Sequence, residues 1–111
     1  MWVFTNTAFI SAVRHRDKPD SLMVRARLPG DLERFFGPDG ADLAVQETRD
    51  ADYRYRCTVS DAVFASALLR AAGQIDYPNF KDSIGPDDQM RHHAYLDVWA
   101  AMHRVQDQGA H

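Results

Sequence analysis

The residues of this sequence that could do acid–base chemistry gather in its last third. Asp76 opens an aromatic stretch, and His92 and His93 lie a short way beyond it. A carboxylate and an imidazole that converge in a pocket can act as general acid and base, so these three are weak catalytic candidates. The chain has 16 acidic residues, which makes such a coincidence easy to meet by chance. A small hydrolase-like enzyme with a His/Asp pocket is one alternative function.

No cofactor motif accompanies these candidates. His93 and Asp97 have the spacing of two metal ligands on one helix face, but no third ligand follows at helical spacing. The sequence contains no nucleophile elbow, phosphate-binding glycine loop or dinucleotide fingerprint. Cys57, the one cysteine, is expected to be a buried structural thiol. We therefore expect no metal and no cofactor, and we favour a protein without catalysis.

Arginines that could recognise anions gather in the segments expected to form strands. They are Arg25, Arg27, Arg54 and Arg56. Because alternate residues of a strand share a face, we expect these four on one face of a sheet, opposite the core. Guanidinium groups bind carboxylates and phosphates through paired hydrogen bonds. The alternative is a solvated face on which Glu47 or Asp50 pairs with the arginines across strands.

Such an arginine face fits an acidic protein surface better than a nucleic acid. A sheet that binds single strands needs exposed aromatic rings beside its basic groups. Tyr53 and Tyr55 instead alternate away from the arginines, toward the expected core. The net charge of -3 also argues against binding through bulk positive charge. Nucleic-acid binding by the arginine face is the second alternative function.

A second contact surface is predicted in the aromatic stretch from Asp76 to Asp82. Tyr77 and Phe80 flank Pro78 there, in a segment with neither helical nor strand periodicity. The two rings either anchor this loop to the body of the protein or present a contact for a protein partner. The sequence leaves both readings open.

The elements that must position these residues predict an α+β fold. Strands are expected at residues 2–4 and 9–13, as one bent strand or a hairpin, and at 22–28, 43–48 and 53–59. Helices are expected at 31–36, at 61–73 with Ser60 as N-cap and Gly73 as terminator, and from Pro86, with a buried stripe. The predicted stripe is Met90, Ala94, Tyr95, Val98, Met102 and Val105, widened by Leu96 and Trp99. The order ββαββαα predicts a four-stranded, largely antiparallel sheet with helices packed on one face.

Length and composition predict one domain in the cytoplasm. The chain has 111 residues, which suffices for one core, and residues 106–111 are expected to form a frayed polar tail. The first residues lack a basic n-region, so no signal peptide or membrane span is expected. One cysteine cannot form an internal disulfide, which fits a reducing compartment. A homodimer through Trp2, Phe4 or Trp99 stays open.

Three stretches carry a resemblance. They are WVFTNTAFISAVRHR, IDYPNFKD, and the pattern HxxYxxVWxxMxxxQ from His92 to Gln106. Together they resemble small proteins of unassigned function encoded by high-GC bacteria and their phages. The resemblance implies no catalytic or binding residue, but it implies a setting in which small proteins inhibit a host complex by covering its surface. We therefore expect a non-catalytic protein that binds a macromolecule, in the first place another protein.

Overall fold

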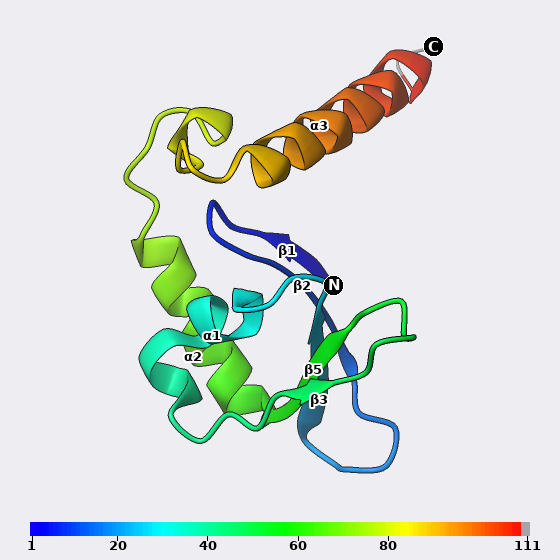
Figure 1. The fold of residues 1–111 in the computed structure, drawn as a ribbon, viewed down its shortest axis with the longest axis vertical. Helices are drawn as coiled ribbons and strands as arrows, with labels where there is room; N and C mark the ends of the chain where they lie inside the picture. Colours follow the sequence, from blue (N-terminus) through cyan, green and yellow to red (C-terminus); the bar gives the residue numbers. More distant parts are fainter. Residues whose placement is uncertain (110–111) are drawn as a thin grey trace. The chain divides into compact units, whose positions relative to one another are not determined.

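The computed structural model describes residues 1–109, and these fall into two compact units (Figure 1). The first unit is Met1–Asp76, and the second begins at Tyr77. The first unit holds the sheet and two helices, and the second holds one long helix. The class is therefore α+β, as predicted, whereas the single-domain organisation stays a prediction.

The sheet of the first unit has five antiparallel strands in the order β1-β2-β3-β5-β4. The strands are β1 (Trp2–Phe4), β2 (Phe9–Arg14), β3 (Ser21–Ala26), β4 (Gln46–Glu47) and β5 (Tyr55–Ser60). The element order is βββαββαα, so the prediction of four strands in the order ββαββαα is wrong by one strand.

The extra strand comes from the N-terminal segment, which forms a hairpin rather than one bent strand. Trp2 lies opposite Ser11, and Phe4 lies opposite Phe9. Thr5 closes the turn, because its Oγ1 accepts a hydrogen bond from the Ala8 amide at 2.9 Å and donates one to the Ala8 carbonyl at 3.1 Å. A side chain that bonds locally in this way offers the backbone an alternative to a continuous strand.

Two helices cover one face of this sheet, as expected. They are α1 (Asp31–Phe36) and α2 (Asp61–Gly73), and a short 3₁₀ turn, η1 (Gly37–Gly40), follows α1. The predicted cap is confirmed, because the Ser60 hydroxyl accepts a hydrogen bond from the Val63 amide at 3.2 Å. Gly73 is the last residue of α2 but does not have a positive φ, which among the described glycines is found at Gly30 and Gly37.

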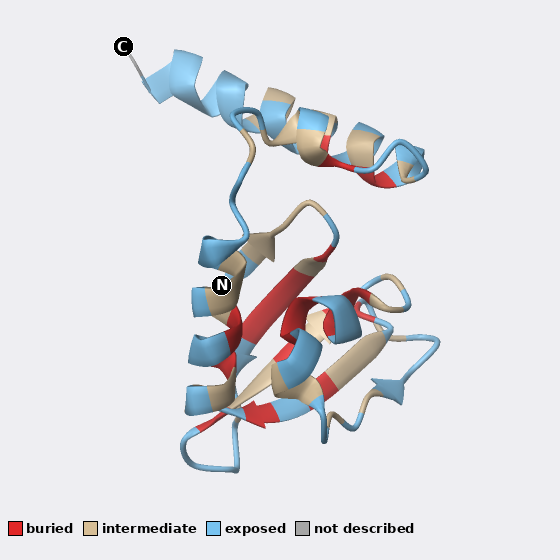
Figure 2. Cartoon of the chain, turned by 90° about the vertical axis from the view of Figure 1, so that its left-hand side faces the viewer, coloured by how far each residue is buried: buried red, intermediate tan, exposed pale blue. Residues whose placement is uncertain are grey.

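The core lies between this sheet face and the two helices, where the buried segments of Figure 2 gather. Every second residue of the central strands enters it, together with the predicted core residues of α1. Its members are Ala8, Ile10, Ala12, Val24, Ala26, Leu32, Phe35, Phe36, Cys57, Val59, Phe64 and Ala67. The opposite face of the sheet carries neither α1 nor α2.

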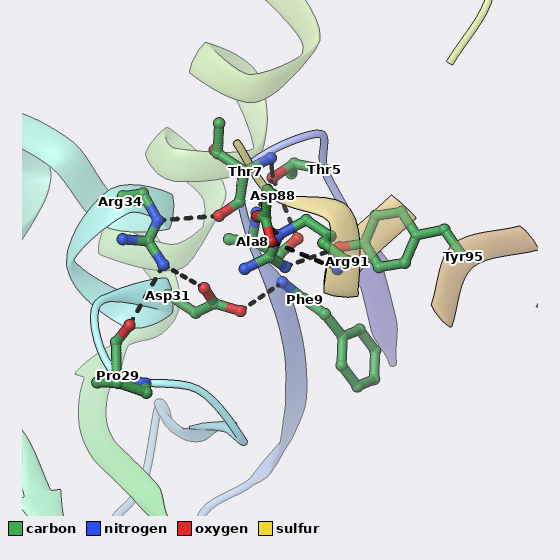
Figure 3. Close-up of polar contacts among 10 residues, drawn as sticks. All are labelled: Thr5, Thr7, Ala8, Phe9, Pro29, Asp31, Arg34, Asp88, Arg91 and Tyr95. Carbon is green, nitrogen blue, oxygen red and sulfur yellow. Dashed lines mark hydrogen bonds and ion pairs between the residues drawn. The ribbon is translucent and has the colours of Figure 1, made fainter. Parts of the chain in front are cut away.

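A buried carboxylate fixes α1 to the first hairpin (Figure 3). Asp31 is 1% exposed, and its Oδ2 accepts a hydrogen bond from the Phe9 amide at 3.0 Å. Its Oδ1 accepts one from Arg34, whose Nε donates to the Thr7 carbonyl at 2.9 Å. A buried charge is tolerated when its oxygens are hydrogen-bonded, and here the bonds also tie two distant parts of the chain together.

The second unit is built on α3 (Gln89–Gly109), preceded by the short 3₁₀ turn η2 (Lys81–Ser83). The helix begins three residues later than predicted, because Asp88 caps it by accepting a hydrogen bond from the Arg91 amide at 3.3 Å. The predicted tail is helical through Gly109, and its last two residues lie outside the described residues.

The predicted buried stripe of α3 is largely exposed in the structure. Arg91 and Tyr95 are the buried residues of this helix. Met90, Val98, Trp99, Met102 and Val105 are between 39% and 71% exposed. The pattern is amphipathic, as the sequence indicates, but no other described element of the second unit covers most of the stripe. None of the described helices is both long and apolar enough to span a membrane.

We predict that Asp31→Asn lowers the free energy of unfolding by about 2 kcal/mol, because the amide cannot accept both hydrogen bonds as a carboxylate does. Chemical denaturation would measure the change. Glu33→Gln is the matched control, since Glu33 lies in the same helical turn but is exposed. Equal stability of the two variants would contradict the role assigned to Asp31.

Candidate protein-binding surface

The face of the sheet without α1 and α2 carries the residues predicted to bind a partner. One row crosses all five strands through Trp2, Ser11, Arg25, Arg56 and Gln46. The neighbours of these residues along the strands point into the core, so the row points the other way. The structure therefore brings Arg25 and Arg56 together on one face.

Tyr53 lies beneath the guanidinium groups of two arginines. The Arg25 guanidinium carbon is 4.5 Å from the centre of the Tyr53 ring, and that of Arg27 is 4.1 Å from it. The ring is only 4% exposed. A ring face attracts cations, and burial of the ring strengthens the attraction. Tyr53 is buried, as predicted, but it lies outside the core cluster between the sheet and the helices, because β5 begins at Tyr55 and Tyr53 precedes the alternation.

Hydrogen bonds to neutral oxygens hold the three arginines in place. Arg27 donates to the Asp52 carbonyl at 2.6 Å, and Arg56 donates to the Tyr53 carbonyl at 3.4 Å. Arg25 donates to the Ser11 hydroxyl at 3.1 Å. We call Arg25, Arg27 and Arg56, with Tyr53 beneath them, the arginine cluster. Arg54, the fourth predicted arginine, is exposed, and its carbonyl accepts a hydrogen bond from Thr48.

No carboxylate among residues 1–109 pairs with an arginine of this cluster. Elsewhere in the first unit arginines do pair with acids: Arg14 with Asp61, Arg34 with Asp31, and Arg70 with Asp39. Glu47, expected to pair with the arginine face, instead lies 4.0 Å from Arg49. In addition, the Nε atoms of Arg25 and Arg56 are buried without a hydrogen-bond partner. The cluster thus carries positive charge that the described chain does not neutralise.

Aromatic rings from the first hairpin share this face, a feature that the sequence reasoning missed. Trp2 is 65% exposed and contacts Phe9 edge to face, with ring centres 5.8 Å apart. Phe4 stacks on Phe9 at 4.4 Å. The register of the hairpin decides which side the rings take, and the sequence left the hairpin itself undecided.

The aromatic loop of the second unit is anchored. Tyr77 packs against Phe80, and Phe80 stacks on Tyr95 of α3 with ring centres 5.7 Å apart. The Tyr95 hydroxyl accepts a hydrogen bond from Arg91 at 3.1 Å, and Arg91 also donates to Asp88 at 2.6 Å. Tyr77 and Phe80 are half-buried, so anchoring accounts for most of their surface.

The catalytic candidates are not assembled into a site that the structure describes. Asp76 ends the first unit and is exposed, whereas His92 and His93 belong to the second. The two imidazole rings are 6.2 Å apart and tilted, and neither bonds to a carboxylate among residues 1–109. Within the same residues, no group of three or more His, Cys, Asp or Glu side chains could hold a metal ion.

Two cavities, of about 230 Å³ and about 220 Å³, lie along β5, and the larger one reaches Gln46 and Arg56, which pair between β4 and β5. Both are lined by Asp42 and Thr58, and Cys57 lines the larger one. Burial, aided by the charge of Glu33, raises the pKa of the Cys57 thiol from 9.0 to about 12. A thiol with so high a pKa stays protonated near neutral pH and is a poor nucleophile.

No protein-family model, curated protein or solved structure matches this chain. What the protein does must therefore be inferred from its own surfaces.

We predict that Cys57 reacts with iodoacetamide at pH 8 at least about 100-fold more slowly in the folded protein than in denaturant, because its thiolate is scarce and shielded. Thiol labelling followed by mass spectrometry would measure both rates. The exposed neighbour provides the control: Thr58→Cys in a Cys57→Ala background should react readily when folded. Fast labelling of native Cys57 would show that the thiol is not buried.

The same pKa shift makes stability depend on pH with a definite sign. The pKa of the Cys57 thiol is higher in the folded protein than in the unfolded chain. The protonated thiol therefore makes its full contribution to the free energy of unfolding below pH 9.0, and this contribution is lost as the pH rises toward about 12. Cys57→Ala should therefore flatten the alkaline part of the stability profile.

Proposed function

We propose that this protein acts without catalysis and binds an acidic surface of another protein through the arginine cluster. The observation that carries the proposal is the set of three guanidinium groups on one sheet face, held in place but paired with no carboxylate among residues 1–109. An acidic partner would supply the missing carboxylates.

The geometry of the cluster favours binding because the arginines are held before the partner arrives. Tyr53 and the carbonyls of Asp52 and Tyr53 fix the side chains, which reduces the conformational entropy lost on binding. Arg27 is exposed, and an exposed guanidinium group can bind a carboxylate through two parallel hydrogen bonds. Arginine, tyrosine and tryptophan are also the residue types that dominate binding energy at protein interfaces, and Trp2 lies in the same row.

The resemblance to small phage and bacterial proteins supports a particular class of partner. In that setting the partner is a host complex, and occupation of its acidic surface inhibits it. Tyr77 and Phe80 are the second choice for the contact, because their rings are half-buried in the second unit rather than fully covered.

We expect a variant that combines Arg25→Ser, Arg27→Ser and Arg56→Ser to lose partner capture at least about tenfold, because each lost bidentate contact weakens binding. Affinity capture from a lysate of the host, treated with nuclease and read by quantitative mass spectrometry, would measure this. Circular dichroism of the variant would check that the fold persists.

The control variant removes three positive charges from outside the arginine cluster. Arg16, Lys18 and Arg49 are exposed cations outside the cluster, and their combined replacement by serine should leave capture unchanged. Equal loss in both triple variants would mean that net charge, not the cluster, holds the partner. Unchanged capture by the cluster variant would remove this face from consideration.

Nucleic-acid binding is a second candidate, because one observation favours it more than the sequence did. The exposed Trp2 ring lies on the same sheet face as Arg25 and Arg56. Exposed rings beside basic side chains are the arrangement on which single-stranded nucleic acids stack. Tyr53 cannot serve in this way, since the guanidinium groups cover its ring.

If this second candidate holds, affinity for a labelled oligothymidylate should fall about tenfold or more between about 50 and about 200 mM salt, because phosphate contacts release counterions. Fluorescence anisotropy would measure it, and Trp2→Ala should weaken binding further. Weak binding with no salt dependence would exclude it.

A further inference from the structure

On the exposed apolar side of α3, four small residues recur at the spacing of a coiled coil. Ala94, Val98, Ala101 and Val105 recur at intervals of four, three and four residues, and we call these four the α3 stripe. This is the spacing of the a and d positions of a heptad, with valine at a and alanine at d. Val98 is 39% exposed and Val105 is 55% exposed, so the stripe meets solvent within the described chain.

One edge of the stripe carries two opposite charges at equivalent places. Asp97 and Arg104 are seven residues apart and both precede a valine of the stripe, which makes them g positions of successive heptads. Seven residues extend about 10 Å along a helix, so the two side chains do not pair within one helix. Both are exposed, and neither makes an ion pair among residues 1–109.

On the side of α3 that lies beyond the e positions Tyr95 and Met102, the aromatic and charged side chains already have partners. Trp99 stacks on His103 with ring centres 5.2 Å apart, and the Lys81 ammonium lies 4.6 Å from the centre of the Trp99 ring. His103 is also 3.4 Å from Asp107. The charges that lack a partner are therefore confined to the edge of Asp97 and Arg104.

We propose that α3 pairs with α3 of a second copy of this chain, in an antiparallel arrangement. In that arrangement g positions face g positions, so Asp97 of each copy meets Arg104 of the other and two identical ion pairs form across the two-fold axis. The charge pattern is thus complementary to itself when the helices run in opposite directions. In a parallel pair g faces e, and the e positions are Tyr95 and Met102, which carry no charge.

The sizes of the stripe residues select the same arrangement. An antiparallel pair places a against d, so Val98 packs on Ala101 of the other copy and Val105 packs on Ala94. Each contact then joins a larger side chain to a smaller one, which fills the space between the helices evenly. A parallel pair would place alanine on alanine and leave gaps between the valine layers.

This inference is independent of the arginine cluster, which lies in the other unit. The order of charges and of side-chain sizes along the α3 stripe also indicates which partner binds it. A foreign helix would have to reproduce both the alternation of size and the order of charge, whereas a second copy supplies both without change.

The experiment compares self-association of the full chain and four variants by analytical ultracentrifugation, from about 1 to about 200 µM, where mass action would reveal a dimer. The variants are D97R, R104D, the double swap D97R/R104D, and D107R. Each single change at Asp97 or Arg104 places like charges opposite each other, so it should raise the dimer dissociation constant about tenfold or more. The double swap restores opposite charges and should return the constant to within about threefold of the original.

D107R is the matched control. Asp107 lies on α3 but away from the stripe, so its reversal should leave the constant unchanged. A chain that stays monomeric over the whole range would overturn the proposal, as would a dimer that ignores the single reversals. A dimer weakened by the double swap as much as by the single changes would overturn the antiparallel register. Circular dichroism of each variant would establish that α3 is intact.

Discussion

The hydrogen-bonded carboxylate of Asp31 is the constraint on which the arrangement of the first unit depends. Burying a charge is costly unless its oxygens find donors, and Asp31 finds them in the Phe9 amide and in Arg34. The Phe9 amide belongs to the start of β2, 22 residues earlier in the chain. Gly30, at a positive φ, lets the chain turn directly into α1 so that Asp31 can reach it.

This constraint decides which face of the sheet α1 and α2 leave uncovered. With α1 held against the start of β2, its residues Leu32, Phe35 and Phe36 enter the core beside Ile10. The α2 helix packs on the same side, because β5 leads into it through the Ser60 cap. Strand alternation then places Arg25 and Arg56 on the opposite side by geometry alone. The absence of α1 and α2 from the arginine face is thus a consequence of where these two helices are fixed.

The sequence predicted the elements whose signals are local. The strand and capped helix around Ser60, the short helix through Phe36 and the two strand arginines are all where alternation and capping placed them. The features that the sequence did not predict depend on contacts between distant residues. The turn at Thr5 splits the first strand, and the alternating pattern allowed a hairpin there without deciding between it and one bent strand. Tyr53 is buried as the alternation predicts, yet the pairing of β5 starts after it, and its ring contacts two arginines rather than the core cluster.

The prediction for α3 was wrong for a different reason. The helix is amphipathic, as predicted, but its apolar side is exposed and not buried. Apolar residues at helical spacing show that one face of a helix avoids water, but not what covers that face. Heptad spacing, the order of charges and the alternation of valine with alanine carry the further information about a partner. If that partner is a second copy, a dimer presents two arginine clusters. A target with two acidic sites within reach would then bind more tightly than either cluster alone allows, with no new contact. The two interactions also separate physically: salt screens the exposed arginine cluster strongly, whereas the apolar part of the α3 contact persists as ionic strength rises.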